Sequence, residues 1–175
     1  KAMLLIGMQE YALAEPHVDF ILSEIPNEPR AGYFKALINA SLKNSDDKTG
    51  NNKLTEVIAT LAAVPEEVMR NTPDYYYLAG LTNFQFGNFT DARRYLEKYL
   101  TYVEFHVDAV RMIAQINLQQ GDTTAARNLL KKANLSQPND ANLLTLLGVT
   151  YLQLKDPDKA ESYFKQVLAM HPNSE

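Results

Sequence analysis

The sequence contains no cysteine, and none of its apolar runs approaches the ~18 residues that a helix needs to cross a bilayer. Without cysteine the chain has no thiol nucleophile, disulfide or cysteine-ligated zinc site, although any cellular compartment remains open to it. Basic residues are also few, since 17 Lys and Arg stand against 21 Asp and Glu, for a formal net charge of −4. A broad nucleic-acid surface needs a clustered basic face, so nucleic acid is not an expected partner.

What remains is a chain of ordinary globular composition. Its 175 residues, 46% of them apolar and 22% charged, are enough to bury a core and fit one domain. The first residue is Lys1 and not a start methionine, so we expect a fragment or a processed form. The apolar run from Met3 to Ile6 is too short for the core of a signal peptide, so any targeting segment has been removed.

The sequence repeats itself with a step of 34 residues. Four independent columns of positions keep this step: Ala92, Ala126 and Ala160; Gly80, Ala114 and Gly148; Tyr76, Val110 and Leu144; and Gly87 and Gly121, with Lys155 next in series. A period in the range of 20 to 50 residues is typical of stacked helical repeats.

Each repeat predicts two short amphipathic helices joined by a tight turn. In residues 73–106 we expect a first helix over 75–86 that ends at Gly87, where glycine accepts the left-handed conformation. A second helix should begin near Thr90 or Asp91, which can cap free backbone N–H groups, and continue to residue 102. The next two repeats predict the same turn at Gly121, Asp122 and Thr123 and at Asp156 and Pro157.

The glycines inside the first helices predict close packing between helices. Glycine at such a place costs up to ~1 kcal/mol of helix stability relative to alanine, so its recurrence needs a reason. We expect Gly80 and Gly148 to approach the second helices at Ala92 and Ala160. Phosphate binding is disfavoured, because these glycines are single and do not form a Gly-rich loop after a strand.

The last repeat carries a known signature. Its matching residues are Leu144, Leu147, Gly148, Tyr151, Ala160, Phe164 and Pro172. They resemble the tetratricopeptide (TPR) pattern of a large residue, then L–G–x2–Y, then A–x3–F, then P. The two repeats before it depart from the pattern, with Asn117 in place of the tyrosine and Glu104 in place of the proline.

The resemblance implies an all-α fold, a right-handed αα-hairpin superhelix, or TPR solenoid, that covers residues 1–175. We expect about five repeats, over residues 1–28 (partial), 29–72 (with an insertion at 43–52), 73–106, 107–140 and 141–174. Solenoids need polar capping repeats, and neither end has one. A last helix over about 158–170 would leave Leu168 partly uncovered, so end-to-end self-association is expected at high concentration.

A narrower resemblance rests on three stretches of sequence. They are Ala14-Glu15-Pro16 followed by Val18 and Ile21-Leu22, then Tyr33-Phe34-Lys35-Ala36-Leu37, and Tyr77-Leu78-Ala79-Gly80 with Ala92-Arg93-Arg94-Tyr95-Leu96. These stretches are similar to the repeat lipoprotein of bacterial PEP-CTERM/exosortase exopolysaccharide systems. That likeness implies a periplasmic or outer-envelope protein with a lipidated cysteine upstream, whereas without it the expected location is cytoplasmic.

Catalytic and metal-binding patterns are missing. His17, His106 and His171 form no ligand pair, and no Gly–x–Ser–x–Gly elbow occurs. Residues 45–56 partly match a calcium loop, but Ser45 and Lys53 are wrong for its ligand set, so a polar surface insertion is favoured. We therefore predict no enzyme, no metal and no cofactor.

The aromatic residues are unevenly distributed, because ten of the seventeen Phe and Tyr residues fall between Tyr75 and Phe105. We expect at least half of this cluster to lie in the core. In the TPR family the first helices line a concave groove, through the second, fifth, ninth, twelfth and thirteenth places of each repeat. Those places here are Arg30, Tyr33 and Leu37; Asp74, Tyr77, Leu81, Phe84 and Gln85; Asp108, Arg111, Gln115, Leu118 and Gln119; and Asn142, Thr145, Val149, Leu152 and Gln153.

This groove predicts a protein or peptide partner. Aromatic residues and arginine are typical of recognition hot spots, and TPR grooves accept extended or helical segments. A clamp for a terminal carboxylate is disfavoured, because only Arg30 and Arg111 are cationic. The sequence thus predicts a non-catalytic interaction scaffold without nucleic-acid binding or membrane insertion. The alternatives are an envelope protein that contacts polysaccharide through Tyr77 and Phe84, and an architectural spacer.

Overall fold

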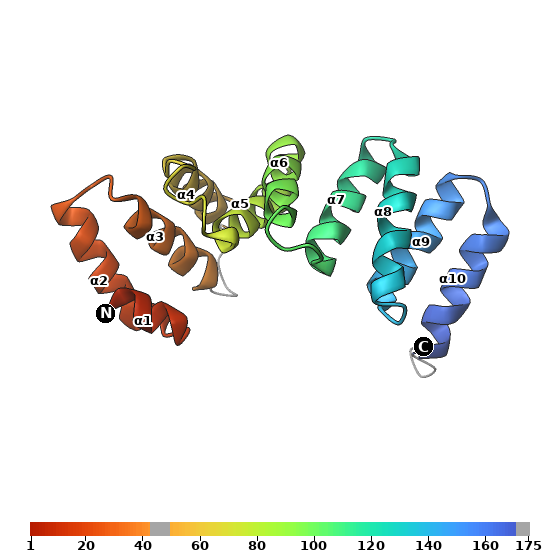
Figure 1. Cartoon of the computed structure of the whole chain (residues 1–175), viewed down its shortest axis with the longest axis horizontal. Helices are drawn as coiled ribbons and strands as arrows, with labels where there is room; N and C mark the ends of the chain where they lie inside the picture. Colours follow the sequence, from red (N-terminus) through yellow and green to blue (C-terminus); the bar gives the residue numbers. More distant parts are fainter. Residues whose placement is uncertain (43–49, 171–175) are drawn as a thin grey trace. The chain divides into compact units, whose positions relative to one another are not determined.

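The computed structural model in Figure 1 describes residues 1–42 and 50–170, with only the backbone at 50–53. The described residues form ten helices and no strand, which is the all-α fold expected. The helices are α1 (Ala2–Gly7), α2 (Tyr11–Glu24), α3 (Pro29–Ser41), α4 (Gly50–Ala62), α5 (Pro73–Phe86), α6 (Phe89–Leu100), α7 (Val107–Gln119), α8 (Thr123–Ser136), α9 (Ala141–Gln153) and α10 (Pro157–Met170). Contacts divide the chain into two compact units, residues 1–99 and 100–175, which we call the amino-terminal and carboxy-terminal units.

The amino-terminal unit begins as a stack of neighbouring helices. Each helix from α1 to α4 packs against the next one in sequence, and α4 packs against α5 (Figure 1). Small and branched side chains form the core between α1, α2 and α3: Ala2, Ala14, Val18, Ala31 and Ile38. Because α4 starts at Gly50, residues 43–49 of the expected insertion, and with them the first half of the calcium-like loop, lie outside the described residues.

The tyrosines at the start of α5 hold the second half of this unit together. Tyr75 is fully buried, and its ring meets those of Tyr33, Tyr76 and Tyr95 edge-on at centroid distances of 6.1, 5.2 and 6.2 Å. Its hydroxyl donates a hydrogen bond of 3.0 Å to the carbonyl of Leu61. Tyr75 thus connects α5 to three other helices, and burial, followed by its interaction with Tyr95, raises its pKa above the usual range.

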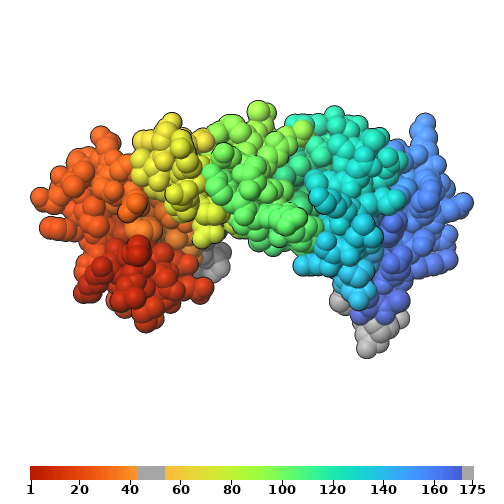
Figure 2. Space-filling model, viewed as in Figure 1, coloured from red at the N-terminus to blue at the C-terminus, as the bar shows by residue number. Residues whose placement is uncertain are grey.

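The carboxy-terminal unit contains α7 to α10, each packed against the next in sequence, and the atoms of its last helices are blue in Figure 2. Its core consists of small and aliphatic residues: Val110, Ala114, Ala126, Leu130, Ala133, Leu143, Leu147 and Ala160, with Tyr151. Side-chain caps start its helices, as expected for Asp122 and Asp156, which accept hydrogen bonds from the backbone N–H groups of Ala125 and Lys159 at 3.0 and 3.2 Å. At the start of α7, Nδ1 of His106 accepts from the N–H of Ala109 at 3.3 Å, so this histidine is a helix cap.

One turn geometry joins the two helices of four repeats. The turn residue has a left-handed backbone each time, at Gln9, Gly87, Gly121 and Lys155, with φ of 61°, 91°, 80° and 60°. The next residue then donates to the carbonyl five positions back at 2.9 Å, in the pairs Glu10–Leu5, Asn88–Asn83, Asp122–Asn117 and Asp156–Tyr151. This is the Schellman motif, which satisfies carbonyl groups that the end of a helix leaves free. After Gly87, α6 begins at Phe89, so Thr90 and Asp91 lie inside its first turn and are not the expected caps.

The mid-helix glycines do mark close approaches between helices. A Cβ atom on Gly80 would lie 2.6 Å from Cγ of Leu96, and one on Gly148 would lie 2.4 Å from Cε1 of Phe164. The expected close packing is therefore confirmed. In each case, however, the nearest atoms belong to the large side chain one turn after the alanine, which is Leu96 after Ala92 and Phe164 after Ala160. Both alanines are fully buried.

We predict that Gly148→Ala destabilises the carboxy-terminal unit by about 1–3 kcal/mol, because the new methyl group would overlap the Phe164 ring. This loss should outweigh the gain of ~1 kcal/mol in helix propensity. Urea unfolding followed by circular dichroism measures the change. Gly7→Ala is the control, since a new Cβ at the end of α1 would meet no atom within 4 Å and should not lower stability. Equal or higher stability of Gly148→Ala would contradict the packing described here.

A second prediction concerns the left-handed turn residue Lys155. Glycine tolerates this conformation without the strain that a Cβ atom adds, so Lys155→Gly should stabilise the chain by about 0.5–1 kcal/mol. The reverse change at the equivalent turn, Gly121→Ala, should destabilise it by about 1 kcal/mol. Thermal unfolding of both variants tests this, and the same sign of change in both would be inconsistent with a shared turn geometry.

Candidate functional site

The residues of the expected groove lie on the first helices of the two units. Those on α3 and α5 belong to the amino-terminal unit, and those on α7 and α9 belong to the carboxy-terminal unit. We describe the two surfaces separately and call the one on α3 and α5 the amino-terminal first-helix surface.

On α5, the five predicted groove residues differ in their exposure to solvent. Asp74 and Gln85 are exposed near the two ends of the helix, while Tyr77, Leu81 and Phe84 between them are half-buried. The Tyr77 ring packs on Tyr99 at 5.1 Å, and the Phe84 ring packs on Phe89 at 5.9 Å. Both aromatic side chains are therefore held in place by α6, which limits the entropy that they would lose on binding.

On α3, Arg30 is exposed and Leu37 is half-buried, but Tyr33 is buried. Its ring lies 5.6 Å from that of Phe34 and 6.1 Å from that of Tyr75. Burial, followed by the negative charge of Asp74, raises the pKa of Tyr33 to about 12. Tyr33 is thus a neutral side chain at physiological pH, with little of its ring open to a partner.

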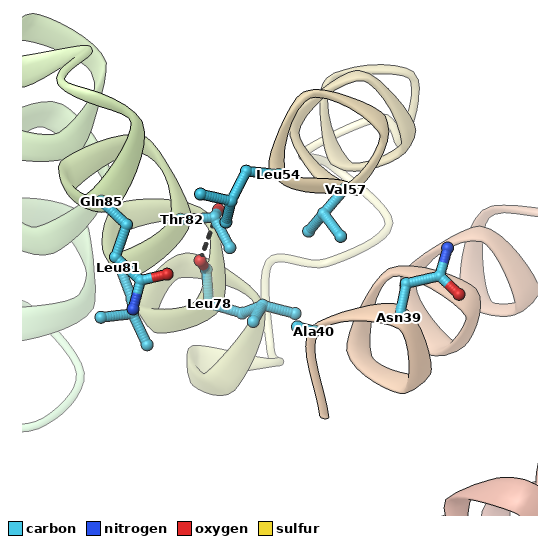
Figure 3. Close-up of a pocket in the computed structure, with 8 residues that line it drawn as sticks. All are labelled: Asn39, Ala40, Leu54, Val57, Leu78, Leu81, Thr82 and Gln85. Carbon is cyan, nitrogen blue, oxygen red and sulfur yellow. Dashed lines mark hydrogen bonds between the residues drawn. The ribbon is translucent and has the colours of Figure 1, made fainter. Parts of the chain in front are cut away.

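An apolar pocket opens between α3, α4 and α5 in this unit, and Figure 3 shows its walls. Ala40, Leu54, Val57, Leu78 and Leu81 make it apolar, and Asn39, Thr82 and Gln85 add polar groups. The hydroxyl of Thr82 donates to the carbonyl of Leu78 at 2.8 Å, so it needs no further partner. The cavity volume is about 90 Å³, which is less than the ~300 Å³ at the lower end for small-molecule sites.

Of the residues that line this pocket, only Leu81 and Gln85 are among the groove residues predicted from the sequence. Ala40 is the twelfth residue of its repeat, so continuing the predicted row past Leu37 would have included it. Leu54 and Val57 lie on α4, after the insertion that breaks the 34-residue register, and no sequence signal places them beside α5.

In the carboxy-terminal unit, several predicted residues already have partners. Arg111 forms an ion pair of 2.8 Å with Asp108 one turn earlier on α7. The side chain of Gln153 accepts a hydrogen bond of 3.3 Å from Thr123, and Thr145 donates to the carbonyl of Ala141 at 2.7 Å. Leu118 packs on the core, and Gln115 is half-buried. The exposed residues of the row are Gln119, Asn142, Thr145, Val149, Leu152 and Gln153.

A second, more polar cavity of about 310 Å³ lies among α4, α5 and α6 of the amino-terminal unit. Arg94 reaches into it, forms an ion pair with Glu66, and lies 4.0 Å from the centre of the Tyr95 ring. Because a carboxylate already neutralises Arg94, this cavity does not offer a free cation.

The structure holds no arrangement that points to metal chemistry in the part that it describes. Over residues 1–42 and 50–170, no three His, Asp or Glu side chains come together as a set of metal ligands. None of the helices in those ranges has the length and apolar character needed to cross a membrane.

Comparison with known proteins gives consistent results for family and fold. Tetratricopeptide repeat family models match residues 83–149 and 141–174. Among solved structures, YrrB, "a TPR protein with an unusual peptide-binding site", is similar with a TM-score of 0.79 and 17% identity, over 99% of this chain and 84% of that one. A MamA crystal structure is similar with a TM-score of 0.76 and 16% identity, over 96% of this chain and 86% of that one. No curated protein sequence gives a significant match.

The two family matches together span residues 83–174, which is more than half of the chain. The structures similar to it share its helical-hairpin fold over nearly its whole length. The Schellman turns, the small residues at close helix contacts and the 34-residue period explain physically why the match occurs. The chain belongs to the tetratricopeptide repeat family.

Proposed function

We propose that this protein is a non-catalytic scaffold that binds a segment of a partner polypeptide on its amino-terminal first-helix surface. The apolar pocket between α3, α4 and α5 carries this proposal, because it lies beside predicted groove residues and accepts one aliphatic side chain rather than a small molecule. Gln85 beside it offers an amide group to the backbone of a bound segment, and Asn39 offers its side-chain oxygen, since its Nδ2 already donates to Glu56 at 3.3 Å. YrrB, which has the same fold, is a peptide-binding TPR protein, and this supports the same class of ligand here.

The biological setting that we propose is the bacterial envelope, in an exopolysaccharide or protein-sorting system. Support comes from the three stretches of sequence similar to the PEP-CTERM/exosortase repeat lipoprotein, two of which, at 33–37 and 77–80, lie on α3 and α5. In that setting a polysaccharide is the competing ligand, because Tyr77 and Phe84 could also stack on sugar rings.

We predict that peptides selected from a random library for binding to this chain depend on the pocket. Leu81→Gln should weaken them at least about tenfold, since a polar amide would replace the apolar wall that a buried aliphatic side chain needs. Titration calorimetry of the selected peptides measures the change.

The matched control is Glu97→Gln, an exposed position on α6 that lies outside the pocket, and it should leave affinity unchanged. Equal affinity of wild type and Leu81→Gln for all selected peptides would rule out the pocket as the binding site. Binding of glycans with no selectable peptide would favour the polysaccharide ligand.

We also propose that the chain associates with itself through its two ends. Met3 and Phe20 on α1 and α2 are 72% and 66% exposed, and Leu168 on α10 is 61% exposed, as expected from the sequence. Burial of such side chains favours association, so sedimentation velocity at millimolar protein should show species larger than a monomer. Leu168→Lys should shift this distribution toward the monomer, and a strictly monomeric wild type would refute the proposal.

A further inference from the structure

The solvent-facing side of α8 carries positive charge only. All of this helix is described, and its 14 residues include basic side chains but no acidic one. One side of α8 packs on α7 and α9. On the other side, Lys131 and Lys132 are exposed and Arg127 is half-buried. Because 3.6 residues make one turn, these three positions fall within about 140° of one another around the helix axis.

No carboxylate neutralises these three cations within the described ranges. Arg127 donates from Nε and Nη2 to the side-chain oxygen of Asn128, at 3.3 and 3.1 Å, and that amide carries no charge. Arg127 and Lys131 are also one helical turn apart, a spacing at which like charges repel and destabilise a helix.

The second helices of the repeats before and after have opposite charges at the same two places. These are Arg93 and Glu97 in α6, and Glu161 and Lys165 in α10. Glu161 and Lys165 form an ion pair of 2.6 Å. A second helix of this fold therefore accepts opposite charges there, and its packing does not require the like charges of α8.

An exposed leucine extends this charged face toward the end of α8. Leu135 is 85% exposed, more than any other large apolar side chain of the described residues. It follows Lys131 by one helical turn, so both side chains lie on the same face. A phosphate or sugar carboxylate could meet the cations but would leave the leucine in water. A polypeptide can supply carboxylates and an apolar side chain together.

We propose that this face of α8 docks an acidic segment of a partner polypeptide. The face, which we call the α8 surface, consists of Arg127, Lys131, Lys132 and Leu135. Charge complementarity carries the inference, and the leucine favours a polypeptide over other anions. The α8 surface belongs to the carboxy-terminal unit, whereas the apolar pocket belongs to the amino-terminal unit, so this inference goes beyond the proposed function.

The rise of the helix predicts the pattern of the bound segment. Arg127, Lys131 and Leu135 follow one another in steps of four residues, which is about 6 Å along the helix axis. In an extended peptide every second side chain points the same way, at a spacing of about 6.6 Å. A segment that lies along α8 therefore matches this face when two acidic residues and an apolar residue occupy alternate positions.

NMR titration of the ¹⁵N-labelled 175-residue chain with synthetic peptides at low ionic strength tests this inference. The probes are acetyl-Glu-Ser-Glu-Ser-Leu-amide, a counterpart with glutamine in place of both glutamates, and a counterpart with serine in place of the leucine. We expect the glutamate peptide to shift the amide signals of α8 and to bind about five- to tenfold more tightly than the glutamine peptide. Salt at about 0.5 M should remove most of this difference, because it screens exposed charges.

Two charge variants separate the α8 surface from general effects of net charge. Lys131→Glu gives α8 the opposite charges found in α6 and α10, so it should abolish the preference for the glutamate peptide without lowering the melting temperature. Lys165→Glu is the matched control, because it makes the same change of charge 34 residues later on α10, and it should leave the preference intact.

Two apolar variants test the role of the leucine in the probe. Leu135→Ser should lower the affinity for the glutamate peptide about threefold, to that of the counterpart without leucine. Leu81→Gln alters the apolar pocket and should leave this affinity unchanged. Loss of binding in Leu81→Gln would show that the pocket holds the leucine, which would support the proposed function and refute docking on α8.

Several outcomes would overturn the inference. Equal affinity for the glutamate and glutamine peptides would refute it, and so would a preference that survives Lys131→Glu or is lost in Lys165→Glu. The absence of saturable binding of the glutamate peptide at tens of millimolar would refute it as well. Digalacturonate also carries two carboxylates, so if it binds as tightly as the glutamate peptide, and equally to wild type and Leu135→Ser, the polypeptide is not the preferred ligand.

Discussion

Close contact between a small residue in the first helix and a large residue in the following second helix sets the geometry of two repeats, those of α5 with α6 and α9 with α10. At Gly80 and Gly148 the partner side chains, Leu96 and Phe164, approach so closely that a methyl group would not fit. A 34-residue hairpin has too little apolar surface to fold alone, so it must pack its helices tightly and then stack on a neighbour. Full burial of a leucine such as Leu96 contributes about 1.5–3 kcal/mol, which exceeds the ~1 kcal/mol that glycine costs in a helix.

The Schellman turn is the second constraint, because it fixes how the two helices of a repeat meet. All four turns share the same pair of hydrogen bonds, yet only two use glycine, and Gln9 and Lys155 adopt the left-handed conformation despite their side chains. The hydrogen bonds and the packing of the flanking helices outweigh that local strain. A turn can therefore keep its geometry after its glycine has been replaced, which weakens the repeat signal in the sequence without changing the fold.

This explains which parts of the structure could be predicted from the sequence. The helices of residues 73–170 follow from Gly87, Gly121 and the periodic alanines, since these residues are required by local geometry and close packing. The pocket could not be predicted, because Leu54 and Val57 follow an insertion that removes the register. Nor could the burial of Tyr33, which depends on its contact with Tyr75, 42 positions away in sequence. By contrast, the Asp108–Arg111 pair is one helical turn apart and was within reach of sequence reasoning.

Repeats also provide an internal standard for recognising function. Where two repeats share a residue for structural reasons, such as Ala126 and Ala160, both copies are buried in the same way. Where they differ, the side chains have different neighbours: Tyr77 packs on the Tyr99 ring, whereas Arg111 pairs with Asp108. Asp74 and Asp108 occupy the same place, but one has an arginine one turn later and the other has a tyrosine. A scaffold built from similar repeats acquires specificity through such differences, because the shared residues already serve the fold.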